Sequence, residues 1–345
     1  MLDLDSVAMA VSGLRAWLCS GGCQSPNGAF VAWLDSATGR RAYDYPEITG
    51  YALTFLAGMA TLTAADRATG HRAGDWLVER LRSGNLAARD GWDNNAVYLF
   101  DLGMIATGLL TYGRRTRSAE YVESGRELAR YLAEEVAADG SFCAVARTGP
   151  SSARDSWSTR GVPHLAKLSQ ALLLADDAAT PAPLIEEVKR AQLPDGRILT
   201  HPEQDEVMLH PHLYAAEGLW VWGSAVGDLE ALECARRAVE WVWTLQLDEG
   251  GLPRSDAEDS PEQCDVTAQA VRLSLVVGRR STAVDRAVAR LIELARSPGD
   301  GLGMPYRTDG DSEGDHLNTW VSLFSAQALA LAVPGARPIA WTELV

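Results

Sequence analysis

The chain has 345 residues, 31 of them basic and 46 acidic, which gives a formal net charge of −15 at pH 7. This balance argues against broad binding to nucleic-acid phosphates or anionic membrane surfaces, because both need clustered Lys and Arg. Hydrophobic residues make up 47% and charged residues 22%, as is ordinary for a folded soluble chain. No apolar run approaches the ~18 residues that a membrane-spanning helix needs. We therefore expect neither a nucleic-acid partner nor membrane insertion; the oligomeric state stays open.

The cysteines and the first residues predict a cytoplasmic location. Five cysteines are an odd count without framework spacing, so reduced thiols are expected. The start, Met1-Leu-Asp-Leu-Asp5, is acidic and lacks the basic region of a secretory signal. No Pro/Ser-rich linker or shift in composition divides the chain, which predicts one domain over residues 1–345.

One turn pattern recurs at intervals of roughly 55 residues. It has a Gly beside Asp, Asn or Glu, often after a Gln, and these residues favour tight turns because they tolerate positive φ. The copies lie at residues 24–30, 138–142, 192–198, 246–253 and 299–305, with a degenerate copy near 83–85. This period predicts an array of similar units.

Two kinds of helix alternate with the turns. Apolar runs with almost no Lys or Glu begin near Glu47, Asn95, Ser156, His210, Asp265 and Asp315, and a helix that is apolar on most faces is buried. Amphipathic runs with one charged face lie at residues 6–19, 65–82, 117–136, 178–192, 227–246 and 281–297. Strand alternation is absent over any useful length.

Six pairs of outer and inner helices predict an all-α fold, a closed (α/α)6 toroid. An open solenoid would need polar capping repeats at both ends. The sixth inner run is as apolar as the second, which favours closure of the last pair on the first.

Two groups of motifs resemble known toroid proteins. Gln246-Leu-Asp-Glu-Gly-Gly-Leu-Pro253, followed by Cys264-Asp-Val-Thr-Ala268, resembles the repeat of the prenyltransferase and squalene-cyclase superfamily. Residues 45–51, 210–219 and 318–320 are similar to uncharacterised toroid proteins associated with polysaccharide gene clusters. The resemblance implies the toroid fold but leaves the reaction open, because the same ring hosts cyclases, transferases, glycosidases, lyases and epimerases.

A pocket is predicted where the inner helices begin. Their N-termini open at one end of such a ring, and the helix dipoles favour acidic groups and anionic ligands there. Capping explains a short Asp or Asn at these starts, but not the aromatic and His side chains beside them. The predicted catalytic residues of this rim are Glu47, Asp93, Asp155, His210, His212, Asp265 and His316. The predicted substrate-binding residues are Tyr45, Tyr51, Trp92, Asn94, Trp157, Arg160, Tyr214, Asn318 and Trp320.

Two further catalytic candidates, Asp101 and Glu217, lie deeper in apolar runs. An ionised carboxylate there is costly unless it is paired. Each is therefore either a structural carboxylate bonded to a neighbouring helix or an acid with a raised pKa. His210, Tyr214 and Glu217 follow i, i+4, i+7 spacing and share one helix face. Each His is also compatible with a hydrogen-bonded rim residue, and His164 with a core position.

The residues favour carbohydrate chemistry but leave two alternatives. Rim carboxylates, His and aromatics suit a sugar, so the main prediction is a glycoside hydrolase, lyase or sugar epimerase without a cofactor. The alternatives are a terpenoid or prenyl cyclase or transferase-like enzyme and a non-catalytic ligand-binding toroid. The cyclase acid motif Asp-x-Asp-Asp-Thr-Ala is matched by one carboxylate alone, Asp265. Zinc held by Cys264, Asp265 and His316 is kept as a minor alternative.

Overall fold

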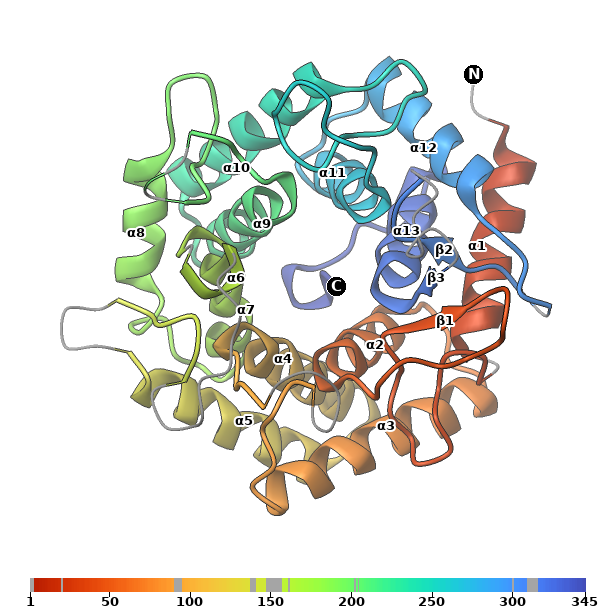
Figure 1. Cartoon of the computed structure of the whole chain (residues 1–345). Coiled ribbons are helices and arrows are strands. Elements are labelled where there is room, and N and C mark those ends of the chain that lie inside the picture. The colour runs from red at the N-terminus through yellow and green to blue at the C-terminus, as the bar shows by residue number, and fades with distance from the viewer. Residues whose placement is uncertain are drawn as a thin grey trace.

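The computed structural model describes residues 3–19, 21–89, 95–136, 141–146, 157–160, 162–201, 203, 205–299, 301–308 and 316–345. Within these ranges, helices form two concentric rings (Figure 1). The outer ring consists of α1 (Leu4–Cys19), α3 (Ala64–Arg82), α5 (Ala119–Glu134), α8 (Ala182–Ala191), α10 (Leu229–Val242) and α12 (Thr282–Leu294). The inner ring consists of α2 (Pro46–Gly58), α4 (Leu99–Thr116), the 3₁₀ helix η1 (Pro163–Leu168) continued by α7 (Ser169–Leu174), α9 (Leu209–Val226), α11 (Cys264–Val276) and α13 (Thr319–Ala332).

The predicted (α/α)6 toroid is confirmed, including its closure. The last inner helix, α13, packs against both α1 and α2, so the end of the chain meets its beginning. Each inner helix also packs on its neighbours in the ring. No helix of the described ranges is long and apolar enough to cross a bilayer.

The turn pattern links neighbouring units. The Gln24 side-chain amide donates to the Gly28 carbonyl in its own turn at 2.8 Å and to the Thr69 carbonyl of α3 at 3.0 Å. Gly28 has a φ of 105°, and a Cβ there would lie 2.2 Å from a backbone oxygen of α3. Gln192 and Gln246 make the corresponding bonds to α10 and α12. The repeated Gln and Gly are therefore joints between a turn and the next outer helix.

A small antiparallel sheet, which the sequence did not predict, closes the seam. Its strands are β1 (Trp33–Asp35), β3 (His316–Asn318) and β2 (Met304–Pro305), in the order β1-β3-β2. Trp33 pairs with Asn318, so the first and last units share the sheet. Strands of two or three residues are too short to show alternation. Because β3 occupies His316–Asn318, the sixth inner helix begins at Thr319 and not near Asp315, as the sequence had predicted.

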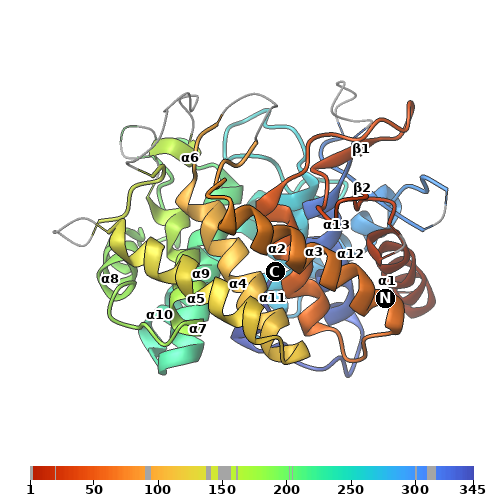
Figure 2. The same ribbon diagram turned by 90° about the horizontal axis from the view of Figure 1, so that it is seen from below.

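The two ends of the ring differ. Figure 2 shows β1 and the short helix α6 (Trp157–Arg160) at one end. At the C-terminal ends of the inner helices, the chain enters the middle of the ring at the 3₁₀ helix η4 (Trp341–Glu343), as Figure 1 shows. The Gln170 amide donates to the carbonyls of Trp341 at 2.9 Å and Leu344 at 3.0 Å. Leu344 and Val345 are buried, so this segment fills the ring at the C-terminal ends of the inner helices, which we call its lower part.

Candidate active site

A pocket of about 380 Å³ lies where the inner helices begin. The second residue of each inner helix lines it: Glu47, Phe100, His164, His210, Asp265 and Trp320. Each of the six units therefore contributes one side chain to the pocket, from the same position of its inner helix. The predicted site residues that the structure brings together here are Tyr45, Glu47, Asp101, His210, Tyr214, Asp265, His316, Asn318 and Trp320.

Two buried carboxyl groups, Glu47 and Asp101, lie on one side of this pocket. Burial raises the pKa of Glu47 to about 7, against the opposing effects of a hydrogen bond from Tyr45 and the positive charge of Arg89. Burial and the neighbouring Glu47 carboxyl raise the pKa of Asp101 well above its ordinary value. Asp101 is 7% exposed, and its Oδ2 has no hydrogen-bond partner among the described residues. Near neutral pH this side of the pocket therefore holds a carboxyl proton.

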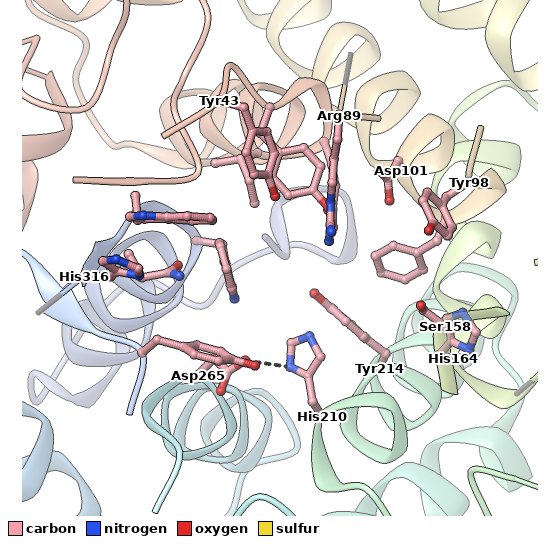
Figure 3. A pocket seen from close by; sticks show the side chains of 18 residues that line it. Tyr43, Arg89, Tyr98, Asp101, Ser158, His164, His210, Tyr214, Asp265 and His316 are labelled. Carbon is pink, nitrogen blue, oxygen red and sulfur yellow. Dashed lines mark ion pairs between the residues drawn. The ribbon is translucent and has the colours of Figure 1, made fainter. Parts of the chain in front are cut away.

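A His–Asp pair lies across neighbouring helices. Nδ1 of His210 on α9 lies 3.1 Å from Oδ2 of Asp265 on α11. The other Asp265 oxygen accepts from the Val266 backbone N–H at 2.8 Å, which fixes the carboxylate. A carboxylate at this distance favours a proton on Nδ1, which would leave Nε2 as the accepting nitrogen. Figure 3 shows His210, Tyr214, Asp101 and Arg89 pointing into the same space.

Tyrosines and a phenylalanine form the floor beneath His210. The Tyr214 ring lies 4.4 Å from the His210 ring and 4.6 Å from the Phe100 ring, centroid to centroid. Tyr51, a predicted substrate-binding residue, is buried below and donates its hydroxyl hydrogen to the Tyr214 hydroxyl at 3.1 Å. Tyr51 therefore does not line the pocket but supports a residue that does.

The walls are aromatic. The Trp33 ring stacks on the His316 ring at 4.9 Å with an interplanar angle of 20°, which joins β1 to β3. The Arg89 guanidinium carbon lies 5.7 Å from the Tyr43 ring centroid and 6.0 Å from that of Tyr45. Such flat faces and hydrogen-bonding tips are what a sugar ring meets in a binding site.

Glu217, a predicted catalytic residue, does not line the pocket. It is fully buried between Lys167 of η1, at 2.9 Å, and Arg272 of α11. Burial opposes its ionisation, but Arg272 and Lys167 outweigh that effect and hold the pKa of Glu217 below its ordinary value. Of the two interpretations left open by the sequence, the structure supports the paired structural carboxylate.

His212 does not line the pocket either. Its ring is fully buried and faces the outer ring: Nδ1 accepts from the Ile198 N–H at 3.2 Å, and Nε2 lies 3.2 Å from the Ala238 carbonyl oxygen. Thr49, Thr267 and Ser322 occupy the same helical position and accept the corresponding backbone N–H of their own turns. His212 is therefore the fourth copy of a structural joint, placed two residues beyond the position that faces the pocket.

Trp92, Asp93, Asn94 and Asp155 lie outside the described residues, as do the side chains of Trp157 and Arg160 in α6.

Sequence reasoning missed several lining residues. His164, for which the sequence left a core position open, follows Pro163 at the start of its helix just as Glu47 follows Pro46, and that shared position was an available signal. Trp33, Tyr43 and Arg89 lie on β1 and on loops, where no periodicity marks their direction.

The zinc alternative gains no support from the geometry. Cys264 is fully buried and does not line the pocket, whereas Asp265 and His316 do. Burial raises the pKa of the Cys264 thiol well above its ordinary value, which disfavours the thiolate that binds metal. The described residues contain no group of three His, Cys, Asp or Glu side chains able to hold a metal ion.

No protein-family profile and no curated protein sequence matches the chain, but solved structures match along nearly its whole length. The unsaturated glucuronyl hydrolase of Bacillus sp. GL1, responsible for the degradation of glycosaminoglycan, is 14% identical with a TM-score of 0.74, over 98% of this chain and 99% of that one. The cellobiose 2-epimerase of Bacillus thermoamylovorans B4167 is 11% identical with a TM-score of 0.74, over 94% and 98%. A type II terpene cyclase from Scytonema is 16% identical with a TM-score of 0.61, over 96% and 98%. At these identities the likeness establishes the toroid fold.

Proposed function

We propose that the protein is a carbohydrate-active enzyme that hydrolyses a sugar linkage by acid–base catalysis. One observation carries the proposal: carboxyl groups with raised pKa values share a pocket with an imidazole that a carboxylate orients. A general acid that is protonated near neutral pH and a base that is unprotonated there are the two groups that glycoside cleavage needs.

In the proposed reaction, Asp101 donates its proton to the oxygen of the leaving group, and the bond between that oxygen and the sugar carbon breaks. Water attacks the sugar carbon and passes its proton to Nε2 of His210. Asp265 holds the imidazole in the tautomer that accepts this proton. Solvent then returns a proton to Asp101 and removes one from His210, which restores both groups.

The substrate class follows from the lining. Tyr43, Trp33, Trp320 and Tyr306 offer faces for the C–H side of a sugar ring, and Asn318 offers an amide for its hydroxyls. The glucuronyl hydrolase and the epimerase among the similar folds, both of which act on sugars by name, support this choice. A cytoplasmic location is part of the proposal, in keeping with the five free cysteine thiols.

A sugar epimerase is the second candidate. The observation that favours it is that imidazoles from separate elements line the pocket: His210 on α9, His316 on β3 and His164 on η1. Two imidazoles can remove a proton from a sugar carbon and return it. A cyclase is less favoured, because the pocket mixes carboxyl, imidazole and guanidinium groups with its aromatics rather than being wholly aromatic. A non-catalytic toroid would not require carboxyl pKa values raised in this way.

The test is a panel of unsaturated glucuronyl disaccharides and cellobiose, incubated in ²H₂O and read by NMR. Hydrolysis yields new reducing ends, whereas epimerisation yields none and places deuterium on a sugar carbon. Asp101→Asn and His210→Asn should each abolish turnover, while Glu233→Gln, on the exposed face of α10, should not. Full activity of both pocket variants would refute the assignment of the site.

A further inference from the structure

The buried Glu217 lies directly below the His–Asp pair and joins the same two helices. His210, Tyr214 and Glu217 lie on one face of α9, and Asp265 and Arg272 lie seven residues apart on α11. The two helices are therefore bridged twice. The upper bridge is His210–Asp265 in the pocket, and the lower bridge is Glu217–Arg272 in the core.

The lower bridge brings together buried polar side chains of three inner helices. Oε2 of Glu217 lies 2.9 Å from Nζ of Lys167, and Oε1 contacts Arg272 and, at 3.5 Å, Nε2 of Gln269. The Arg272 guanidinium carbon lies 4.3 Å from the centroid of the Phe324 ring. Every one of these groups is buried, so water cannot replace a lost contact. One carboxylate thus fixes α9 against η1 on one side and α11 on the other.

We infer that Glu217 is a positioning residue: through the spacing of α9 and α11 it sets the contact between His210 and Asp265. The helices are rigid over the two turns between the bridges, so a shift at the lower bridge moves the upper one. Nδ1 of His210 and Oδ2 of Asp265 lie 3.1 Å apart, and the attraction between the imidazole and the carboxylate weakens when the two helices move apart. The catalytic meaning of this inference rests on the proposed function, in which His210 is the base.

Stability alone gives Glu217 no need to be charged. Replacing a whole buried ionic cluster by apolar residues of similar volume is often neutral or stabilising, whereas removing one member leaves an unpaired charge. Positioning and stability therefore separate in a variant that removes all three charges. Glu217→Met, Lys167→Met and Arg272→Met together remove all three charges of the cluster, and with Lys167 its 3.5 Å contacts to the Leu344 and Val345 oxygens.

The experiment reads the His210 tautomer by ¹⁵N NMR of histidine-labelled protein, without substrate. The His210→Asn variant assigns the signal. In the native protein, Asp265 should hold the Nδ1–H form. Glu217→Gln and the triple Met variant should both move the population toward the Nε2–H form, even though the triple variant keeps its fold and melting temperature.

A matched control removes a buried carboxylate elsewhere. Oδ2 of Asp66, on α3, lies 2.5 Å from Arg15, far from α9 and α11 in the ring. Asp66→Asn should lower the melting temperature and leave the His210 signal in place. Arg272→Lys keeps the charge and shortens the reach, so it tests the bridge even where the other variants fail to fold.

An unchanged His210 signal in the folded triple variant, or in Arg272→Lys, overturns the inference. An equal change in Asp66→Asn also overturns it, because the signal would then follow general destabilisation. Since no substrate is involved, this result is independent of whether the protein hydrolyses, epimerises or only binds a sugar.

Discussion

Two regions of the ring bury acidic side chains but shift their pKa values in opposite directions. In the lower region, Glu217 is 0% exposed and has two cations, so it stays ionised despite burial. In the pocket, Asp101 is 7% exposed, has Glu47 as a neighbour, and has a pKa well above its ordinary value. Burial is thus similar in both regions, and the number of cations beside each acid differs.

The difference separates a structural charge from a reactive one. A neutralised buried charge fixes geometry and resists protonation, whereas an incompletely neutralised carboxyl retains its proton and can donate it. The fold therefore places its structural ion cluster below the pocket and its proton donor in the pocket.

The largest effect is expected for Asp101→Asn, which keeps the shape and removes the proton donor. Loss of a general acid costs roughly 10²–10⁴-fold in rate. Stability should not fall, because a buried carboxyl that resists ionisation gives way to a neutral amide. Activity on the identified sugar and thermal unfolding would be measured side by side. A fully active variant would show that another residue is the general acid.

Glu217→Gln, unlike Asp101→Asn, should lower the stability of the protein. Lys167 and Arg272 would stay buried beside an uncharged partner, and breaking such a pair costs about 3–5 kcal/mol of folding free energy. Denaturant titration of variant and native protein measures this loss. A loss of folding free energy below about 1 kcal/mol would mean that water reaches the ion cluster in the folded protein.

Glu47→Gln tests the pocket through pH. The pKa of Glu47 rises from its ordinary 4.5 to about 7 on folding, so the native state binds this proton more tightly than the unfolded state does. Relative to the Gln variant, the native protein should therefore lose stability as the pH rises from 4.5 through 7. The loss is about 3 kcal/mol, at 1.36 kcal/mol for each pKa unit. If the stability of both proteins depended on pH in the same way, the Glu47 carboxyl would be exposed to solvent with an ordinary pKa.

The sequence predicted the ring because its signals are local and repeated. The Gly of the turns, preceded by Gln in three copies, recurs along the chain together with the two helix types. The position of Glu47, His210 and Asp265 at the helix starts follows from the same register. The number of helices and the place of the pocket could therefore be derived without any knowledge of distant contacts.

What the sequence could not show depends on contacts between units. Glu217 and Asp101 look alike in sequence, as single acids in apolar helices. They differ because Lys167 and Arg272, which come from other units, lie against Glu217 alone. Likewise, His210 and His212 are two residues apart, and the helix directs one to the pocket and the other to the outer ring. The seam sheet rests on strands too short to leave a pattern.

The smallest expected effect, that of His212→Ala, tests whether a histidine near the rim belongs to the structural class. The variant leaves the Ile198 N–H without its acceptor, which costs about 1–3 kcal/mol of folding free energy, while the pocket keeps every group and turnover per folded molecule stays the same.

Burial lowers the pKa of His212 to about 4, so below pH 6.5 the unfolded state binds a proton that the native state does not bind. The stability that the native protein holds over the variant should therefore shrink as the pH falls from 6.5 to 4. His212→Thr, which restores the hydroxyl found at the same position in other units, should lose less than Ala. If turnover disappears in a folded His212→Ala protein, His212 belongs with the catalytic residues and not with the structural joints.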